Sequence, residues 1–246
     1  MEPSERIALI SGVSREEGIG FGVAKALVAL GFDVILTARN LASAQALSEK
    51  IESPQNVIAK ALDITQDESI SEIVEFVENK FQKLDVLINN AGAGFDFGTH
   101  PLETDLEFTK NTLDINLFGA WRMIKGFYPL LKKSNQPRVV NISSGAGSFG
   151  DPVFGLGVHP SIVTSYGISK LALNGLTVKL AREFSEKGDS IKINSVCPGF
   201  VATYEGTAAM GARPVSEAIP GIIWAATLSE AGPTGGFFRD KETLSW

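Results

Sequence analysis

Cysteine and histidine are scarce in this chain. Of its 246 residues, only Cys197 is a cysteine and two are histidines. A single cysteine excludes a disulfide bond within the chain, which suits a reducing compartment. So few sulfur and nitrogen ligands also argue against a zinc site. We therefore expect a protein that holds no metal.

Long apolar runs and an excess of positive charge are also absent. No apolar run reaches the ~18 residues that a membrane-spanning helix requires. The formal net charge is −6, which argues against nucleic acid or an anionic membrane as the main partner. Glu2, Glu5 and Arg6 precede the first apolar run and leave no room for a signal peptide. The expected location is cytoplasmic.

Short apolar runs alternate with helical patterns along the whole chain. Such runs predict strands that are buried on both faces of a sheet, here at 6–11, 33–38, 56–64, 86–89, 138–143, 192–196 and 236–239. Helices are predicted between them at 20–30, 41–51, 67–81, 106–132, 164–187 and 215–228. The alternation predicts one α/β domain over residues 1–246, with about seven mostly parallel strands in a doubly wound sheet and helices on both faces. Ligands bind such sheets beyond the carboxyl ends of the strands.

A glycine-rich turn joins the first predicted strand to the first helix. It contains Gly12, Gly18 and Gly20. Glycines allow a tight turn and a close approach of the backbone to a pyrophosphate, whose charge the helix N-terminus stabilises. A simple turn is the alternative, but the position after the first strand favours dinucleotide binding.

Tyr166 and Lys170 lie four residues apart in a predicted helix and therefore share one of its faces. An ammonium group there favours the phenolate and lowers a phenol pKa that is normally near ~10. Tyr166 is therefore a candidate proton donor. The spacing alone also fits a solvated helix face, so other segments must decide.

Taken together, these segments resemble the short-chain dehydrogenase/reductase family over nearly the whole chain. The motifs occur in the family's order: the glycine-rich turn, Asp63-Ile64, Asn89-Asn90-Ala91-Gly92, the set Asn116, Ser144, Tyr166 and Lys170, and Pro198-Gly199-Phe200-Val201-Ala202-Thr203. The ending, with Gly235–Asp240 and Trp246, is most similar to the carbonyl reductase branch. The resemblance implies a Rossmann-like fold and a reversible reduction of a ketone or aldehyde to an alcohol.

The resemblance also implies the catalytic roles. Tyr166 would protonate the carbonyl oxygen as hydride reaches the carbon, and Ser144, in preference to Ser143, would hydrogen-bond that oxygen. Lys170 would lower the pKa of the phenol and bind the nicotinamide ribose. Asn116 would hold the long helix open around a water that relays protons to Lys170.

The cofactor-binding residues are carried over in the same way. Asp63 would accept a hydrogen bond from adenine, although it is also suited to cap its own loop. Asn90 would border the adenosine, although it is also suited to bridge strand backbones. The full expected set is Gly12, Ser14, Arg15, Gly18, Ile19, Gly20, Arg39, Asp63, Ile64, Asn90, Ala91, Gly92, Tyr166, Lys170, Pro198, Gly199, Val201 and Thr203.

The end of the second strand indicates the cofactor. Enzymes that use the dephosphorylated cofactor usually place Asp or Glu here, whereas this chain has Thr37, Ala38 and Arg39. An arginine pairs bidentately with a 2′-phosphate. The sequence therefore predicts NADP(H), with a merely solvated Arg39 as the alternative.

One departure concerns the glycine-rich turn. Five residues separate Gly12 from Gly18, where the family usually has three. The longer turn, with Gly22, resembles enoyl-acyl-carrier reductases, but those enzymes space tyrosine and lysine more widely and lack the serine. Carbonyl reduction is therefore favoured over enoyl reduction, and both over a non-catalytic NADP-binding regulator. Arg15 is a candidate ligand of the 2′-phosphate, while Glu16 and Glu17 should point away.

The substrate is expected to be a small apolar carbonyl compound. Two loops, around 145–164 and 203–213, would contact it, and the first contains Phe149, Phe154, Leu156 and His159. Phe95 and Phe97 follow the Asn-Asn-Ala-Gly motif near the same edge. Aromatic side chains in loops beyond strand ends are suited to line an apolar pocket. His159 is expected to be a loop residue. The chain fits either a monomer or a homo-oligomer.

Overall fold

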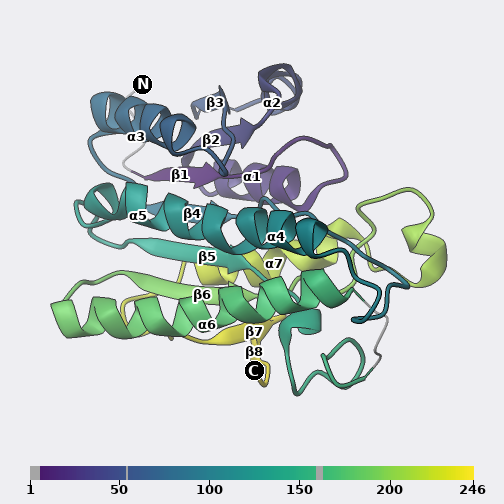
Figure 1. Ribbon diagram of the computed structural model, residues 1–246. Helices are drawn as coiled ribbons and strands as arrows, with labels where there is room; N and C mark the ends of the chain where they lie inside the picture. Colours follow the sequence, from purple (N-terminus) through teal and green to yellow (C-terminus); the bar gives the residue numbers. More distant parts are fainter. Residues whose placement is uncertain (1–5, 54, 159–162) are drawn as a thin grey trace.

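The computed structural model describes residues 6–53, 55–158 and 163–246, and one sheet crosses all three ranges (Figure 1). Its strands lie in the order β3-β2-β1-β4-β5-β6-β7-β8. They span β1 Ile7–Ile10, β2 Asp33–Ala38, β3 Val57–Ala61, β4 Val86–Asn89, β5 Arg138–Ile142, β6 Lys192–Val196, β7 Phe237–Arg239 and β8 Glu242–Thr243. All neighbours pair in parallel except β7 and β8. The predicted doubly wound sheet is confirmed.

The eighth strand was not predicted. It forms a hairpin with β7 through Asp240 and Lys241, which both have positive φ, at 53° and 73°. Two-residue hairpin turns require this conformation, and Asn-Gly or Asp-Gly is their usual sequence signal. Asp-Lys lacks the glycine, so the pattern gave no sign of a turn.

Helices cover both faces of the sheet (Figure 1). They are α1 Ile19–Ala29, α2 Leu41–Ser48, α3 Asp67–Phe81, α4 Leu106–Leu113, α5 Ala120–Leu131, α6 Thr164–Lys187 and α7 Val215–Ala226. Alternate strand residues face opposite sides, so Ile7 and Leu9 join a core with α3, α5 and α6, while Ala8 and Ile10 join one with α1 and α7. No helix of the described chain combines the length and apolarity that crossing a membrane requires.

The helix predicted at 106–132 is interrupted. Between α4 and α5 lies a π-helical segment, η1, at Asp114–Gly119. Such segments often occur at functional sites, and this one contains the buried Asn116. Gly119 packs closely there, because a Cβ atom would come within 2.6 Å of Ile64 Cδ1. The π-helical segment therefore determines the position of Asn116, and through Gly119 it packs against Ile64 in the segment after β3.

The strand order reverses between β1 and β4, which creates a crevice at their carboxyl ends. Asn90, just past β4, reaches back to the end of β1. Its backbone N–H donates to Ser11 Oγ at 3.1 Å, and its Nδ2 donates to Ser11 O at 2.8 Å. These bonds fix the carboxyl ends of β1 and β4, which flank the crevice, relative to each other.

Phe127 of α5 is fully buried in the core beneath α3 and α6. Phe127→Ala should lower the free energy of unfolding by about 3–5 kcal/mol, because it leaves a cavity. The control is Phe118→Ala in η1, whose side chain is 45% exposed, and which should change stability by only about 0.5 kcal/mol. Urea denaturation measures both, and equal losses would contradict the assigned packing.

Candidate active site and cofactor cleft

A cleft of about 890 Å³ lies at the carboxyl ends of the strands. Most predicted site residues line it: Gly12, Ser14, Arg15, Gly18, Ile19, Gly20, Arg39, Asp63, Ile64, Asn90, Ala91, Gly92, Tyr166, Lys170, Pro198 and Thr203. Asn116, Ser144, Gly199 and Val201 do not line it. The cleft therefore gathers segments from both ends of the sequence, from Gly12 to Tyr204.

The glycine-rich turn leaves space where a dinucleotide would lie. Gly12 has φ of +73°, and a Cβ atom there would come within 2.6 Å of Ala91 Cα. Gly18 is the N-cap of α1, and no side chain caps this helix. The positive end of α1 thus faces the cleft, as anion binding requires. These residues fit a pyrophosphate.

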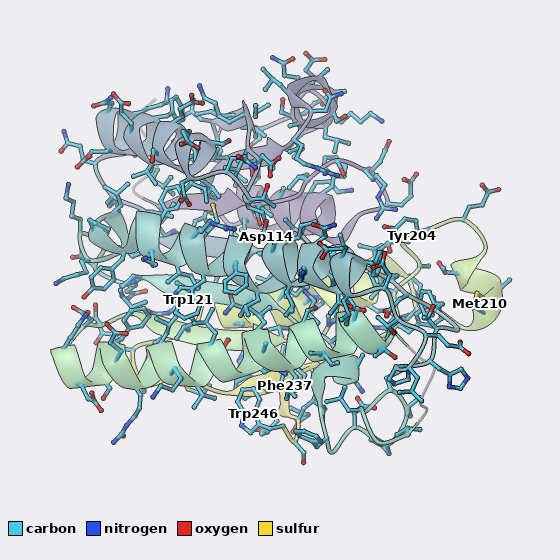
Figure 2. All side chains as sticks on the ribbon, viewed as in Figure 1. Asp114, Trp121, Tyr204, Met210, Phe237 and Trp246 are labelled. Carbon is cyan, nitrogen blue, oxygen red and sulfur yellow. The ribbon has the colours of Figure 1, made fainter. Side chains whose placement is uncertain are left out.

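Arg15 spans the cleft. Its Nη1 donates to Thr203 O at 2.9 Å, and its Cζ lies 3.7 Å from the centre of the Tyr204 ring. Figure 2 shows Tyr204 at the edge of the molecule, next to the protruding segment that carries Met210. Glu16 instead pairs with Lys50. The long turn therefore brings Arg15 against the segment after β6, and its role as a 2′-phosphate ligand stays a prediction.

Asp63 and Asn90 both show the structural contacts that the sequence left as alternatives. The third strand ends at Ala61, so its predicted end at residue 64 is wrong. Asp63 Oδ1 accepts from Thr65 N at 3.0 Å and from Thr65 Oγ1 at 2.7 Å, because the chain turns there towards α3. Asn90 bridges Ser11 and Gly12, with 3.1 Å between its Nδ2 and Gly12 O.

Arg39 is exposed and lines the cleft together with Ala38, Asn40 and Asp63. The bonds from Thr65 lower the pKa of the Asp63 carboxyl despite its partial burial, and the charge of Arg39 adds to this effect. Thr37, two residues earlier, is buried and donates to Ile10 O at 3.1 Å. No carboxylate therefore ends β2, and Arg39 offers a cation where a 2′-phosphate would lie.

Tyr166 and Lys170 line another part of the cleft, and Ser144 lies next to Tyr166 although it does not line the cleft itself. Lys170 Nζ lies 5.4 Å from the centre of the Tyr166 ring, one turn away on α6. The Ser144 hydroxyl, just past β5, is close enough to the Tyr166 phenol to act on its pKa as a hydrogen-bond partner. Ser143 is buried and instead donates to Asn174 Oδ1 at 2.6 Å. Ser143 also lines the cleft, but its hydroxyl is committed to Asn174, so Ser144 is the serine that acts on the phenol.

The pKa of the Tyr166 phenol differs from the value expected from the sequence. Burial raises the pKa of the Tyr166 phenol, Cys197 raises it further, and the hydrogen bond with Ser144 opposes the rise. Lys170 does not reverse it, because its ammonium donates to Ile142 O at 2.8 Å and its own burial lowers its pKa to about 8. The expected net lowering of the phenol pKa is therefore wrong, and Tyr166 holds its proton at neutral pH.

Asn116 acts as a clamp in this structure. Its Nδ2 donates to Ala93 O and to Ser169 Oγ, both at 2.9 Å, and its Oδ1 accepts from Ala93 N at 2.9 Å. A Cβ atom on Gly92 would lie 3.4 Å from Asn116 Oδ1 and 3.5 Å from Lys170 Nζ. Asn116 therefore fixes the segment after β4 against α6, close to Lys170, and the water relay stays a prediction.

An aromatic wall, formed by Phe95, Phe97 and Tyr204, flanks Tyr166. The Phe95 ring centre lies 4.5 Å from that of Tyr166, 6.0 Å from that of Phe97 and 6.4 Å from that of Tyr204. All three wall residues are exposed. The sequence predicts Phe95, Phe97 and the loop that contains Tyr204 near the substrate, but not the contact between Tyr204 and Arg15, which lies 189 positions earlier. His159 lies outside the described residues.

Comparison with known proteins agrees with this geometry. The family model for short chain dehydrogenase matches residues 6–209. The bovine (Bos taurus) carbonyl reductase (NADPH) 1 is 30% identical, and the alignment covers 100% of both chains. The (+)-neomenthol dehydrogenase of Arabidopsis thaliana is also 30% identical, with 98% of both chains covered.

Solved structures give the same result. The NADPH-bound carbonyl reductase from chicken fatty liver superposes with a TM-score of 0.83 at 27% identity, covering 98% of this chain and 99% of that chain. The resemblance to carbonyl reductases is thereby confirmed. The chain belongs to the short-chain dehydrogenase/reductase family of oxidoreductases.

Proposed function

We propose that the protein is an NADP(H)-dependent oxidoreductase that reversibly reduces a ketone or aldehyde to an alcohol. The observation that carries this proposal is that Tyr166 and Lys170 line the same cleft as the glycine-rich turn, with Ser144 next to the Tyr166 phenol. A carbonyl group beside Tyr166 would lie at the nicotinamide end of a dinucleotide in this cleft.

When bound, NADPH supplies the hydride. A carbonyl oxygen placed between Ser144 and Tyr166 receives hydrogen bonds from both hydroxyls, which stabilise its developing negative charge. Tyr166 is protonated at neutral pH and transfers its proton to that oxygen. Lys170, with a pKa of about 8, is mostly cationic at pH 7, and its charge favours loss of the phenol proton.

NADP(H) is the cofactor that the residues and the relatives support. Arg39 is the cation at the end of β2, where no carboxylate competes for the ribose. The bovine relative is named for NADPH, and the chicken structure contains it. Arg39 would therefore bind the 2′-phosphate.

The substrate would be a small apolar carbonyl compound. The aromatic wall beside Tyr166 offers a stacking surface, and we expect the loops around 145–164 and 203–213 to contact the substrate as well. The single domain over 1–246 and the cytoplasmic location stay predictions, as does the choice between monomer and homo-oligomer.

The long glycine turn was the reason to keep enoyl reduction as an alternative. In this structure the extra length has a separate use, since it lets Arg15 reach Thr203 and Tyr204. Ser144 also lies against the phenol. Both observations favour carbonyl reduction.

Tyr166→Phe tests the proton donor. Because no other hydroxyl beside Lys170 is proposed to give up a proton, the variant should lose about 10²-fold or more in kcat while it still binds NADPH. Turnover is followed by the loss of NADPH absorbance and binding by fluorescence. Activity above about a tenth of the wild type would show that Tyr166 is not the general acid.

Arg39→Ala tests cofactor choice. A charge-assisted hydrogen bond contributes ~1.5–3 kcal/mol, so NADPH affinity should fall roughly ten- to a hundredfold and NADH affinity should barely change. Arg182→Ala is the control, since it removes an exposed arginine of α6 that does not line the cleft and should change neither affinity. Equal losses for NADPH and NADH in Arg39→Ala would make Arg39 a structural residue.

The pKa of Lys170 leads us to expect that NADPH binding depends on pH. Its pKa of about 8 lies below the ordinary 10.5, so the free protein loses this cation as the pH rises through about 8. Affinity for the anionic cofactor should therefore fall above that pH. Titrations from pH 7 to pH 10 should show this fall in the wild type and none in Lys170→Met. A pH-independent wild-type affinity would contradict the placement of Lys170 in the binding site.

A further inference from the structure

An ion pair between Arg239, which is partly exposed, and the buried Asp151 packs against Gly145, the residue after Ser144. Arg239 Nη2 is 2.5 Å from Asp151 Oδ2, and the Asp151 side chain is 1% exposed. The two groups enclose Gly145, because a Cβ atom there would come within 2.2 Å of Asp151 Oδ2 and 2.6 Å of Arg239 Nη2. The backbone that follows Ser144 thus packs on this pair.

The sulfur of Cys197 joins the same arrangement. Its Sγ accepts hydrogen bonds from the backbone N–H groups of Gly145 at 3.2 Å and Gly199 at 3.4 Å. It also accepts from Arg239 Nη2 at 3.2 Å and Nε at 3.4 Å. One buried atom therefore links the carboxyl ends of β5, β6 and β7, immediately behind the phenol and serine hydroxyls.

The C-terminal residues hold the serine loop, residues 145–158, from the other side. Ser148 Oγ donates to Ser245 O at 2.8 Å, and Gly150 N donates to Trp246 O at 3.2 Å. Trp246 stacks on Phe237 of β7 with 5.5 Å between ring centres (Figure 2). The serine loop is therefore attached to the end of the chain at several points.

Stability alone is a poor explanation for the ion pair. Burial works against both charges, and replacing a buried pair by apolar residues is often neutral or stabilising. The bonds from Phe154 N, Val153 N and Arg239 nevertheless lower the pKa of Asp151. Asp151 therefore stays ionised, and its directional contact with Arg239 can hold the backbone of Gly145 in place.

We propose that Arg239 is a positioning residue that holds Ser144 at the carbonyl oxygen by joining Asp151 of the serine loop to Cys197. This inference rests on the proposed carbonyl reduction. Arg239 touches neither Tyr166 nor the glycine-rich turn in its hydrogen bonds, so its effect reaches the reaction through Ser144.

The test is a double-mutant cycle with Ser144→Ala. Arg239→Met should lower kcat by about ten- to a hundredfold, since a misplacement of about 1 Å can cost that much, while NADPH affinity stays within about twofold of the wild type. Arg239→Lys, which keeps the charge but not the fork of donors, should recover part of the loss. In the Ser144→Ala background, Arg239→Met should cause no further loss.

Matched variants keep the result interpretable. Arg182→Met removes an arginine from an exposed pair with Glu186 on α6 and should leave kcat unchanged. If Arg239→Met does not fold, as judged by NADPH binding, Asp151→Asn takes its place in the same cycle. Losses that multiply in the double variant would overturn the positioning role alone. Full turnover by Ser144→Ala would instead overturn the proposed role of the serine.

Discussion

The docking of α6 on the sheet is the interaction on which the site depends. A chain of buried polar bonds fixes it: Asn89 Nδ2 donates to Asn141 Oδ1, Asn141 Nδ2 donates to Thr177 Oγ1, and Thr177 shares a hydrogen bond with Ser195. Apolar packing alone tolerates sliding and rotation, whereas unsatisfied polar groups in a core are costly. These bonds therefore set the register of α6, and with it the position of Tyr166 over the end of β5.

The fold followed from sequence because its signals are local. Buried parallel strands appear as short apolar runs, and the glycine-rich turn marks the first crossover. Tyr166, Lys170 and Ser144 were found for a similar reason, since they belong to short motifs. The π-helical segment and β8 were missed, because Asp114–Gly119 keeps an ordinary helical pattern and Asp240-Lys241 lacks a turn glycine.

Contacts between residues far apart in the sequence, and the pKa shifts that these contacts cause, could not be predicted from the sequence. Arg15 meets Thr203, and Arg239 meets Asp151 and Cys197, across separations that leave no spacing signal. The predicted lowering of the Tyr166 phenol pKa was wrong for the same reason. Helical spacing places Lys170 near Tyr166, but burial of the phenol and the bond from Lys170 to Ile142 O arise only in the folded chain.

The proposed function requires that hydride reach the carbonyl carbon of the substrate. The most direct measurement uses NADPH deuterated at the nicotinamide carbon that transfers hydride, with an α,β-unsaturated ketone as substrate and mass spectrometry of the product. Carbonyl reduction predicts an allylic alcohol with deuterium on the carbinol carbon. A saturated ketone with deuterium at the β carbon, lost in Tyr166→Phe, would contradict it and identify an enoyl reductase.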